Sequence, residues 1–142
     1  MSRHGEKVGV LGAAFRCAEC GEIAGVLRLT PAGQPVDMGP PLGRTTHEAD
    51  GVSLDLFGGT SWHRLEGEAF GRLRALIETD APDGPDALEI RRVHWELAPF
   101  LCRECGDVYC WTDWKPSVTF DDGFYDETRG TCPRGHRQTI DD

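Results

Sequence analysis

Apolar and polar residues alternate along this chain in a way that first predicts strands. Residues 25–30 (GVLRLT) are rich in aliphatic side chains, and residues 52–57 (VSLDLF) alternate apolar and polar positions as a half-buried strand does. Two prolines and a glycine in residues 31–35 predict a turn, and the scarcity of apolar positions in residues 36–50 predicts a loop. The first half of the chain is therefore expected to form short antiparallel strands.

A helical period follows the second strand. Between residues 66 and 77 the apolar side chains recur at spacings of three and four, which places them on one face of a helix: Ala69, Phe70, Leu73, Leu76 and Ile77. We expect Thr60 or Ser61 to cap this main helix. A shorter second helix is expected to begin after a cap at Asp86 and to run to about Trp95.

The C-terminal part returns to strand-like patterns. Residues 108–114 suit a strand, and residues 117–120 and 124–128 are expected to pair as a hairpin. The residues between those arms, Asp121-Asp122-Gly123, favour a turn that needs positive φ. The polar tail QTIDD, residues 138–142, is expected to fray.

These elements predict an α+β fold, a small domain of antiparallel hairpins with one main packed helix and a short second helix. We expect a single domain over residues 1–142, with residues 1–14 flexible apart from a strand near residues 7–11. The hydrophobic content of 39% is ordinary for a globular protein, and no apolar run approaches the ~20 residues that span a bilayer.

The amino-acid composition indicates which classes of partner and which compartment to expect. The formal net charge is −9, which disfavours nucleic acid, because affinity for it rests on basic side chains that neutralise phosphates. The apolar run at residues 8–15 is broken by glycines and does not resemble a signal peptide, so we expect a cytoplasmic protein. Two lysines stand against thirteen arginines and asparagine is absent, a codon bias that predicts a GC-rich bacterial genome as the source. In that compartment cysteines stay reduced, which favours metal binding over disulfides.

The cysteines are arranged as metal ligands. Residues 17–21 (CAECG) and 102–106 (CRECG) are both CxxCG turns, in which two thiolates point at one ion and the glycine accepts the backbone conformation of the turn. Cys110 and Asp113 form a third pair, and Cys132 and His136 a fourth. Eight ligands are the number that two tetrahedral zinc ions need, so we expect one or two Zn²⁺.

Three partitions of these ligands are possible. In the favoured one, the first zinc is bound by Cys102, Cys105, Cys132 and His136, and the second by Cys17, Cys20, Cys110 and Asp113. Alternatively the two CxxCG turns share one zinc, or only the C-terminal site holds metal. Asp113 is the weakest ligand, and its competitors are His47, His63 and His94.

The C-terminal third resembles small bacterial zinc-ribbon or treble-clef-like proteins. The resemblance rests on the segments CxxCG at residues 102–106, YCxxxW at 109–114, FDDGFYD at 120–126 and TCPxGH at 131–136. It implies a zinc-ribbon-like part over residues 99–136 and a bound metal. It implies no activity.

The motifs of common enzymes are missing from the sequence, including metalloprotease, deaminase, nucleophile-elbow and phosphate-loop patterns. We therefore expect a non-catalytic zinc module that binds another protein, with contacts among the aromatic residues Trp62, Trp111, Trp114, Phe124 and Tyr125. The first alternative is a metalloenzyme with an open site at Cys17, Cys20 and Cys110. The second is a zinc-ribbon nucleic-acid binder using Arg64, Arg72, Arg74, Arg91 and Arg92.

Overall fold

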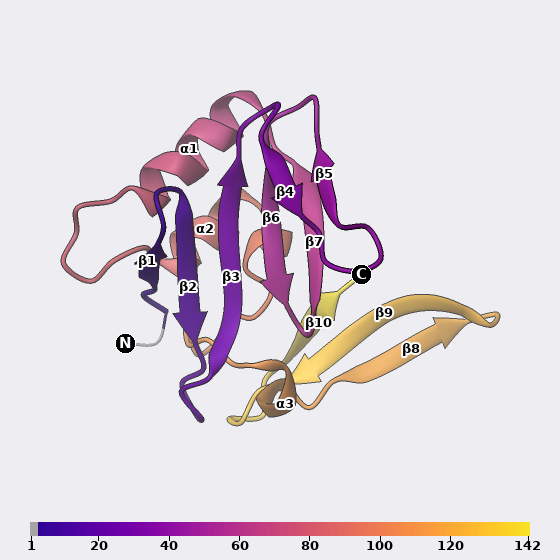
Figure 1. Cartoon of the computed structure of the whole chain (residues 1–142). Helices are drawn as coiled ribbons and strands as arrows, with labels where there is room; N and C mark the ends of the chain where they lie inside the picture. The colour runs from indigo at the N-terminus through magenta and orange to yellow at the C-terminus, as the bar shows by residue number, and fades with distance from the viewer. Residues whose placement is uncertain (1–2) are drawn as a thin grey trace.

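A five-stranded antiparallel sheet forms the larger half of the protein (Figure 1). The computed structural model describes residues 3–142. The strand order is β1-β2-β3-β6-β7. The strands are β1 (Glu6–Val8), β2 (Gly12–Arg16), β3 (Ile23–Thr30), β6 (Gly51–Leu56) and β7 (Gly59–Arg64). The strands expected near residues 25–30 and 52–57 are confirmed as β3 and β6.

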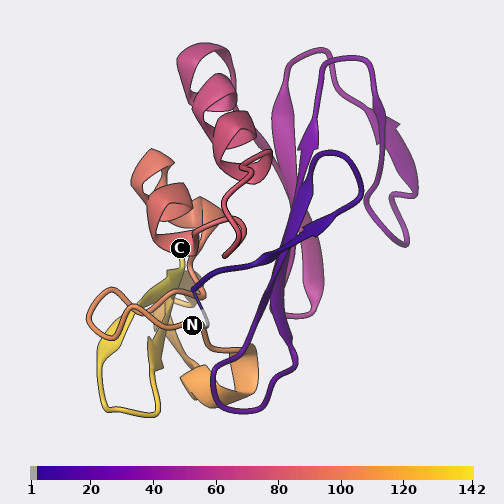
Figure 2. The same cartoon turned by 90° about the vertical axis from the view of Figure 1, so that its left-hand side faces the viewer.

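Two helices cover one face of this sheet. Figure 2 shows α1 (Gly67–Ile77) and α2 (Ala87–Val93) side by side on the face opposite the small hairpin of β4 (Pro35–Asp37) and β5 (Arg44–Thr46). Asp86 caps α2 as predicted, because its carboxylate accepts a hydrogen bond from the Leu88 amide at 3.0 Å. A 3₁₀ turn, η1 (Trp95–Leu97), continues the chain after α2.

The main core lies between the sheet and the helices. Leu73 and Ile77 of α1 are 0% and 1% exposed, and burial of each such side chain contributes about 1.5–3 kcal/mol. Phe15 from β2 and Phe100 from the segment after η1 pack at a ring distance of 5.4 Å. The helical period therefore identified the buried face of α1 correctly.

A separate three-stranded sheet forms the C-terminal part, in the order β10-β9-β8. Its strands are β8 (Ser117–Asp121), β9 (Phe124–Thr131) and β10 (Arg137–Asp141). The predicted hairpin is confirmed, since Asp122 and Gly123 have φ of 49° and 83° at its tip. In Figure 1 this hairpin extends away from the body of the molecule.

Several sequence-based expectations need correction. Thr60 and Ser61 lie within β7 rather than at a helix start, and the N-cap of α1 is Glu66, whose side chain makes no capping hydrogen bond. Residues 108–114 do not form a strand. They contain an isolated bridge at Val108 and a single helical turn, α3 (Trp111–Trp114).

Both chain ends are more structured than expected. The segment 1–14 contributes β1 and the start of β2 from residue 6 onward, with Ala13 fully buried, and residues 1–2 lie outside the described part of the chain. The polar tail forms β10, in which Gln138 and Ile140 are 3% and 1% exposed. Residues 36–50 also hold the short strands β4 and β5.

Among the helices of residues 3–142, none has the length and apolar character needed to cross a bilayer. The α+β class is confirmed by the antiparallel sheets and packed helices.

Candidate metal centres

The structure brings the eight candidate ligands into two groups of four, which are the groups of the favoured partition. We name Cys102, Cys105, Cys132 and His136 the C-terminal group, and Cys17, Cys20, Cys110 and Asp113 the bridging group. Within each group the ligand atoms all lie within 4.8 Å of one another. Each group can therefore hold a metal ion.

The two CxxCG segments fold into the same turn. In one, the Gly106 amide donates to the Cys102 carbonyl at 2.9 Å and the Cys102 amide donates to the Asp107 carbonyl at 2.8 Å. In the other, the equivalent bonds join Gly21 to Cys17 at 3.0 Å and Cys17 to Glu22 at 2.8 Å. Gly106 and Gly21 have φ of 74° and 76°, a region that residues with a Cβ rarely adopt.

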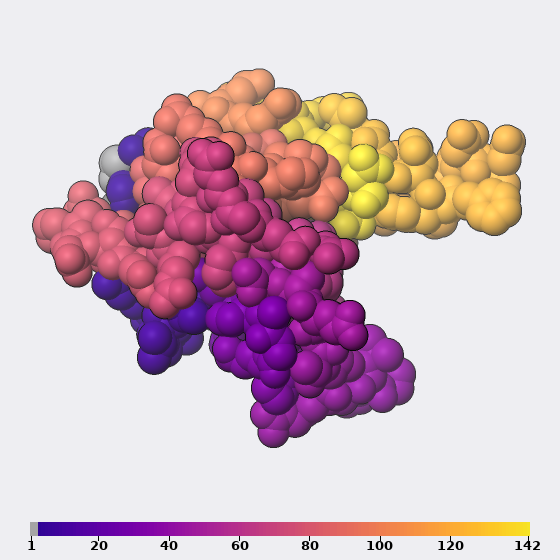
Figure 3. Space-filling view, turned by 90° about the horizontal axis from the view of Figure 1, so that it is seen from above, coloured from indigo at the N-terminus to yellow at the C-terminus, as the bar shows by residue number. Residues whose placement is uncertain are grey.

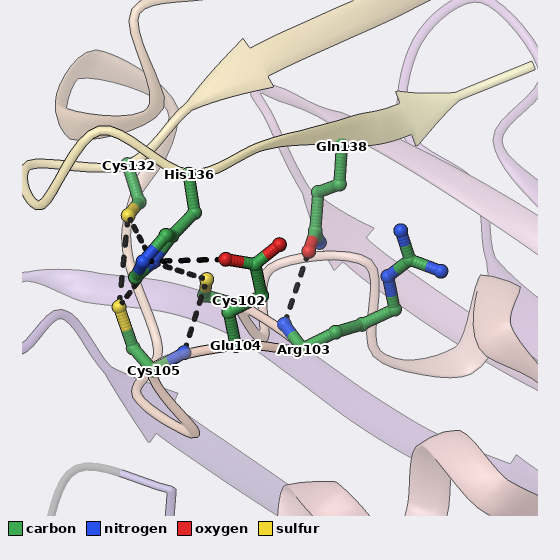
Figure 4. A network of polar contacts seen from close by, with 7 residues as sticks. All are labelled: Cys102, Arg103, Glu104, Cys105, Cys132, His136 and Gln138. Atoms are coloured by element: carbon green, nitrogen blue, oxygen red, sulfur yellow. Dashed lines mark hydrogen bonds and ion pairs between the residues drawn. The ribbon is translucent and has the colours of Figure 1, made fainter.

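The second half of the C-terminal group is a tighter turn between β9 and β10. The Cys132 amide donates to the His136 carbonyl at 2.8 Å, and the Gly135 amide donates to the Cys132 carbonyl at 2.9 Å. Gly135 has φ of 90°, so the glycine of TCPRGH is required by the turn. This turn aims Cys132 and His136 at the CxxCG turn across from it (Figure 4).

Among four donor separations of the C-terminal group, three fit a tetrahedral cation, and the one between Cys105 Sγ and His136 Nδ1 is shorter. The Sγ atoms of Cys105 and Cys132 are 3.6 Å apart, and His136 Nδ1 lies 3.0–3.6 Å from the three sulfurs. A tetrahedral zinc with bonds of about 2.3 Å to sulfur and about 2.0–2.1 Å to nitrogen separates neighbouring donors by about 3.5–3.8 Å. A disulfide would require about 2.05 Å, and all six cysteines are free.

Two side chains outside the ligand set support this group, and sequence reasoning missed both. Glu104 Oε2 lies 3.3 Å from His136 Nε2, which leaves Nδ1 facing the sulfurs. Buried Gln138 accepts from the Arg103 amide at 3.0 Å and donates to the Leu101 carbonyl at 2.8 Å. The carboxylate orients the imidazole, and the amide fastens β10 to the CxxCG turn. Gln138 and Ile140 lie two residues apart and are both buried in β10. This period of two was the signal that could have revealed a buried strand.

The bridging group joins parts of the chain that are far apart in sequence. Cys17 and Cys20 come from the turn between β2 and β3, and Cys110 and Asp113 come from the cap and first turn of α3. The sulfurs of Cys20 and Cys110 are 3.7 Å apart, and Asp113 Oδ2 lies 3.0 Å from the sulfur of Cys17 and 3.3 Å from that of Cys110. The separation between the two sulfurs suits a tetrahedral ion with a carboxylate as the fourth donor, and the two separations to Asp113 are shorter.

The pKa shifts describe the protein without a cation. Burial raises the pKa of the Cys102 thiol to about 11 and that of Cys110 to about 12. Burial also raises the pKa of Cys17, and its hydrogen bond to Asp113 raises it further while lowering the pKa of that carboxyl. For Cys132, burial acts in the same direction, but hydrogen bonds from the amides of His136 and Arg134, together with those from Cys105 and Cys102, lower the pKa overall. A divalent cation reverses this preference for thiols, because it binds thiolates.

The competing histidines lie elsewhere. His47 stacks on Trp62 with ring centroids 3.7 Å apart, and His63 Nδ1 lies 3.4 Å from Glu96 Oε2. His94 accepts a hydrogen bond from the Glu96 amide at 3.2 Å. Within residues 3–142, none of these three belongs to either group of metal-ligating residues.

Some predicted surface residues have other roles. Trp114 is fully buried, and its Nε1 donates to the Phe100 carbonyl at 3.1 Å. Phe124 and Tyr125 are exposed at 77% and 44%. The arginines proposed to bind nucleic acid are largely paired with carboxylates: Arg64 with Glu66, Arg74 with Glu78, and Arg92 with Glu89.

The fold and the two groups define a small α+β protein with two candidate metal centres. A family model described as "Domain of unknown function (DUF8328)" matches residues 6–142, so the chain belongs to that family. Searches of curated proteins and of solved structures found no match. The resemblance to zinc-ribbon and treble-clef-like proteins stays a prediction.

Proposed function

We propose that this protein is a zinc-stabilised protein-interaction module without a reaction of its own. Zinc is the metal that suits sulfur-rich, four-donor groups, whereas calcium and magnesium require oxygen ligands. The C-terminal group offers three sulfurs and one nitrogen, and the bridging group offers three sulfurs and one oxygen. Both sets suit the reducing cytoplasm expected for the protein.

The observation that carries this proposal is the position of the C-terminal group at the root of an exposed hairpin. We name residues 117–128 the arm. Cys132 follows directly after β9, and His136 directly precedes β10. On the other side of the root, a Cβ at Gly130 would lie 2.9 Å from the Trp114 ring, so β9 and α3 are in close contact. A zinc ion in this group would hold the arm at a fixed angle to the body.

The arm presents a bare strand edge with apolar side chains. β8 is the outermost strand of its sheet, and all five of its residues are exposed. Val118, Phe120 and Phe124 are 48%, 65% and 77% exposed. Figure 3 shows the arm extending well beyond the rest of the surface. An exposed apolar edge strand is a template for strand addition by another chain.

The two faces of the arm differ in character. Val118 and Phe120 are two residues apart and share one face, with Tyr125 directly opposite Phe120. The other face carries Asp121 with Phe124 opposite it, and Thr119 with Glu127 opposite it. One face of the arm is thus apolar, and the other combines acidic side chains with the exposed ring of Phe124.

Charge identifies the kind of partner. The arm contains Asp121, Asp122, Asp126 and Glu127 and no lysine or arginine; Arg129, directly after it, pairs with Glu127 and leaves the three aspartates as its excess negative charge. A second copy would bring two acidic arms together, and the whole chain already carries a net charge of −9. We therefore propose an extended segment of another protein, with alternating apolar and basic side chains, as the occupant of the β8 edge.

A short peptide of alternating valine and lysine tests this proposal with the zinc-loaded full chain. We expect amide chemical shifts in NMR spectra to change along β8, with affinity that falls as salt is added. A matched peptide of alternating valine and glutamate should not bind. Phe120→Ser should weaken binding about tenfold, since its exposed ring contributes contacts but little to folding.

Three results would contradict it: equal binding of both peptides, unchanged binding by the Phe120→Ser protein, or shifts confined to residues outside the arm. Metal analysis of the same sample is expected to give two zinc ions per chain. Tight binding of DNA or RNA at low salt would instead favour the nucleic-acid alternative.

A further inference from the structure

A pocket opens directly beside the bridging group. Its volume is about 380 Å³, within the range of about 300–1,000 Å³ typical of small-molecule sites. Three of the four bridging ligands line it, namely Cys20, Cys110 and Asp113. Cys17, which is 4% exposed, does not line it and closes the group from the protein side.

The remaining wall of this pocket is largely apolar. Ile23 is 44% exposed at its edge, and Trp111 is 36% exposed. Phe57 packs against Trp111 with ring centroids 4.9 Å apart. Phe57 also has φ of 54°, a conformation that is costly for a bulky residue with a Cβ and is often found at functional sites. The turn between β6 and β7 therefore holds an aromatic ring beside the bridging group.

We propose that the bridging group is a metal site that accepts an external thiol, which displaces Asp113 and places its apolar body in the pocket. The inference rests on the zinc proposed above for this group. Carboxylate oxygen is a harder donor than sulfur, so Asp113 is the ligand that a soft donor replaces most easily. The pocket supplies both the route of entry and the contacts for an aromatic or aliphatic substituent.

The exchange balances without any oxidant or reductant. The incoming thiol loses its proton to solvent, its sulfur bonds to the metal, and the bond from the metal to the Asp113 oxygen breaks. One singly charged donor replaces another, so the total charge of the ligand set does not change. The product is a four-sulfur site with the Asp113 carboxylate released toward solvent.

The C-terminal group offers no comparable exchange. All of its donors are sulfur or nitrogen, and Cys102 and Cys132 are 0% and 2% exposed. An external thiol is therefore expected to act at one of the two groups only.

Cobalt(II) in place of zinc makes the exchange visible. The full chain loaded with two equivalents of Co²⁺ is titrated with benzyl mercaptan. The thiolate-to-cobalt absorption of the bridging site should rise by about one third, because three sulfur donors become four, while the bands of tetrahedral cobalt remain. 2-Mercaptoethanol, which lacks the aromatic body, should need about tenfold more thiol for half-saturation.

Two variants tie the response to this site. Asp113→Cys fills the fourth position with a protein thiolate and should abolish the response while two Co²⁺ remain bound. Ile23→Ser removes an exposed apolar contact that the fold does not need, and should raise the half-saturating concentration of benzyl mercaptan roughly threefold.

The possible failures are distinct. Binding of only one Co²⁺ contradicts the two-site proposal and this inference with it. Two bound Co²⁺ with no change on thiol addition overturns this inference alone. It is also overturned by loss of the tetrahedral bands, which means that the thiol strips the metal, or by an undiminished response in the Asp113→Cys protein.

Discussion

The two candidate metal centres begin from nearly the same five residues and end in different environments. CRECG in the C-terminal group and CAECG in the bridging group fold into the same hydrogen-bonded turn. The first faces a second tight turn that supplies Cys132 and His136, and the second faces one turn of helix that supplies Cys110 and Asp113. The local sequence thus determines the conformation of each CxxCG turn, and the segment that faces the turn determines the other two ligands of the metal centre.

The difference extends to solvent and to neighbouring side chains. In the C-terminal group, Cys102 is fully buried and His136 is backed by Glu104. In the bridging group, Cys20 is exposed and a pocket reaches the ligands. A closed set of sulfur and nitrogen donors suits a structural role, whereas an accessible set with a carboxylate suits exchange. This comparison leads to four predictions.

The largest effect is expected from Cys105→Ser, which removes a ligand of the C-terminal group. Structural zinc in small domains binds with an apparent ~10–16 kcal/mol, comparable to the ~5–15 kcal/mol stability of a whole domain. We expect loss of soluble folded protein or, in any soluble fraction, loss of one zinc per chain. Metal analysis and circular dichroism measure both outcomes.

Cys20→Ser is the matched control in the bridging group. Because Cys20 is exposed, this variant should stay folded and lose only the bridging zinc. A soluble Cys105→Ser protein with unchanged metal content would contradict the assignment of the C-terminal group.

The next largest effect is expected from Trp114→Ala. Trp114 is fully buried, packs edge-on to Tyr109 and lies in the cluster that contains Cys17, Cys102 and Cys132. Truncation of a buried tryptophan costs about 3–5 kcal/mol, so urea unfolding of the zinc-loaded protein should shift by that amount. Trp111→Ala, on the same helical turn but 36% exposed, should cost clearly less. Equal costs would mean that this cluster does not support the two centres.

A smaller and more selective effect is expected from Asp113→Ala. Loss of the carboxylate should lower the zinc affinity of the bridging group at least about tenfold, while the C-terminal zinc stays bound. Asp113→Cys should raise that affinity instead. Competition with a chromophoric chelator separates the two sites, and unchanged affinity in Asp113→Ala would exclude this residue as a ligand.

The smallest effect is expected from Glu104→Gln. The side chain is 65% exposed, so its contact with His136 Nε2 is weakened by solvent, and a decrease of a few-fold in C-terminal zinc affinity is expected. Glu19→Gln changes the equivalent position of the other CxxCG turn, where no histidine is a ligand, and should have no effect. A chelator titration that finds equal changes in both variants would contradict a role for Glu104 in orienting the imidazole.

Much of the fold was predictable where one physical signal dominated. The spacing of Leu73 and Ile77 placed α1 against the sheet, and Asp122-Gly123 predicted the hairpin tip. The missed strands had weak signals. β7 (GTSWHR) is polar and only partly buried, and β10 buries Gln138, a residue type that is usually exposed.

The α3 turn shows most clearly where prediction from local sequence fails. Its aromatic residues favour a strand by local propensity, yet the segment is helical from Trp111 to Trp114. A helical turn places Cys110 and Asp113, three residues apart, on one side, and Lys115 in the left-handed region ends it. Packing of Trp114 into the core outweighs the local preference.

The sequence by itself determined the chemistry of this protein: the sulfur-rich donors, the glycines that permit the CxxCG turns, and the spacing within each ligand pair. These properties depend on neighbouring residues along the chain. Which pair meets which, how deeply each centre is buried, and whether a pocket reaches it were decided only by the tertiary structure. Those features depend on contacts such as Cys17 with Asp113, which lie 96 residues apart and form only when the sheet and the C-terminal part pack together.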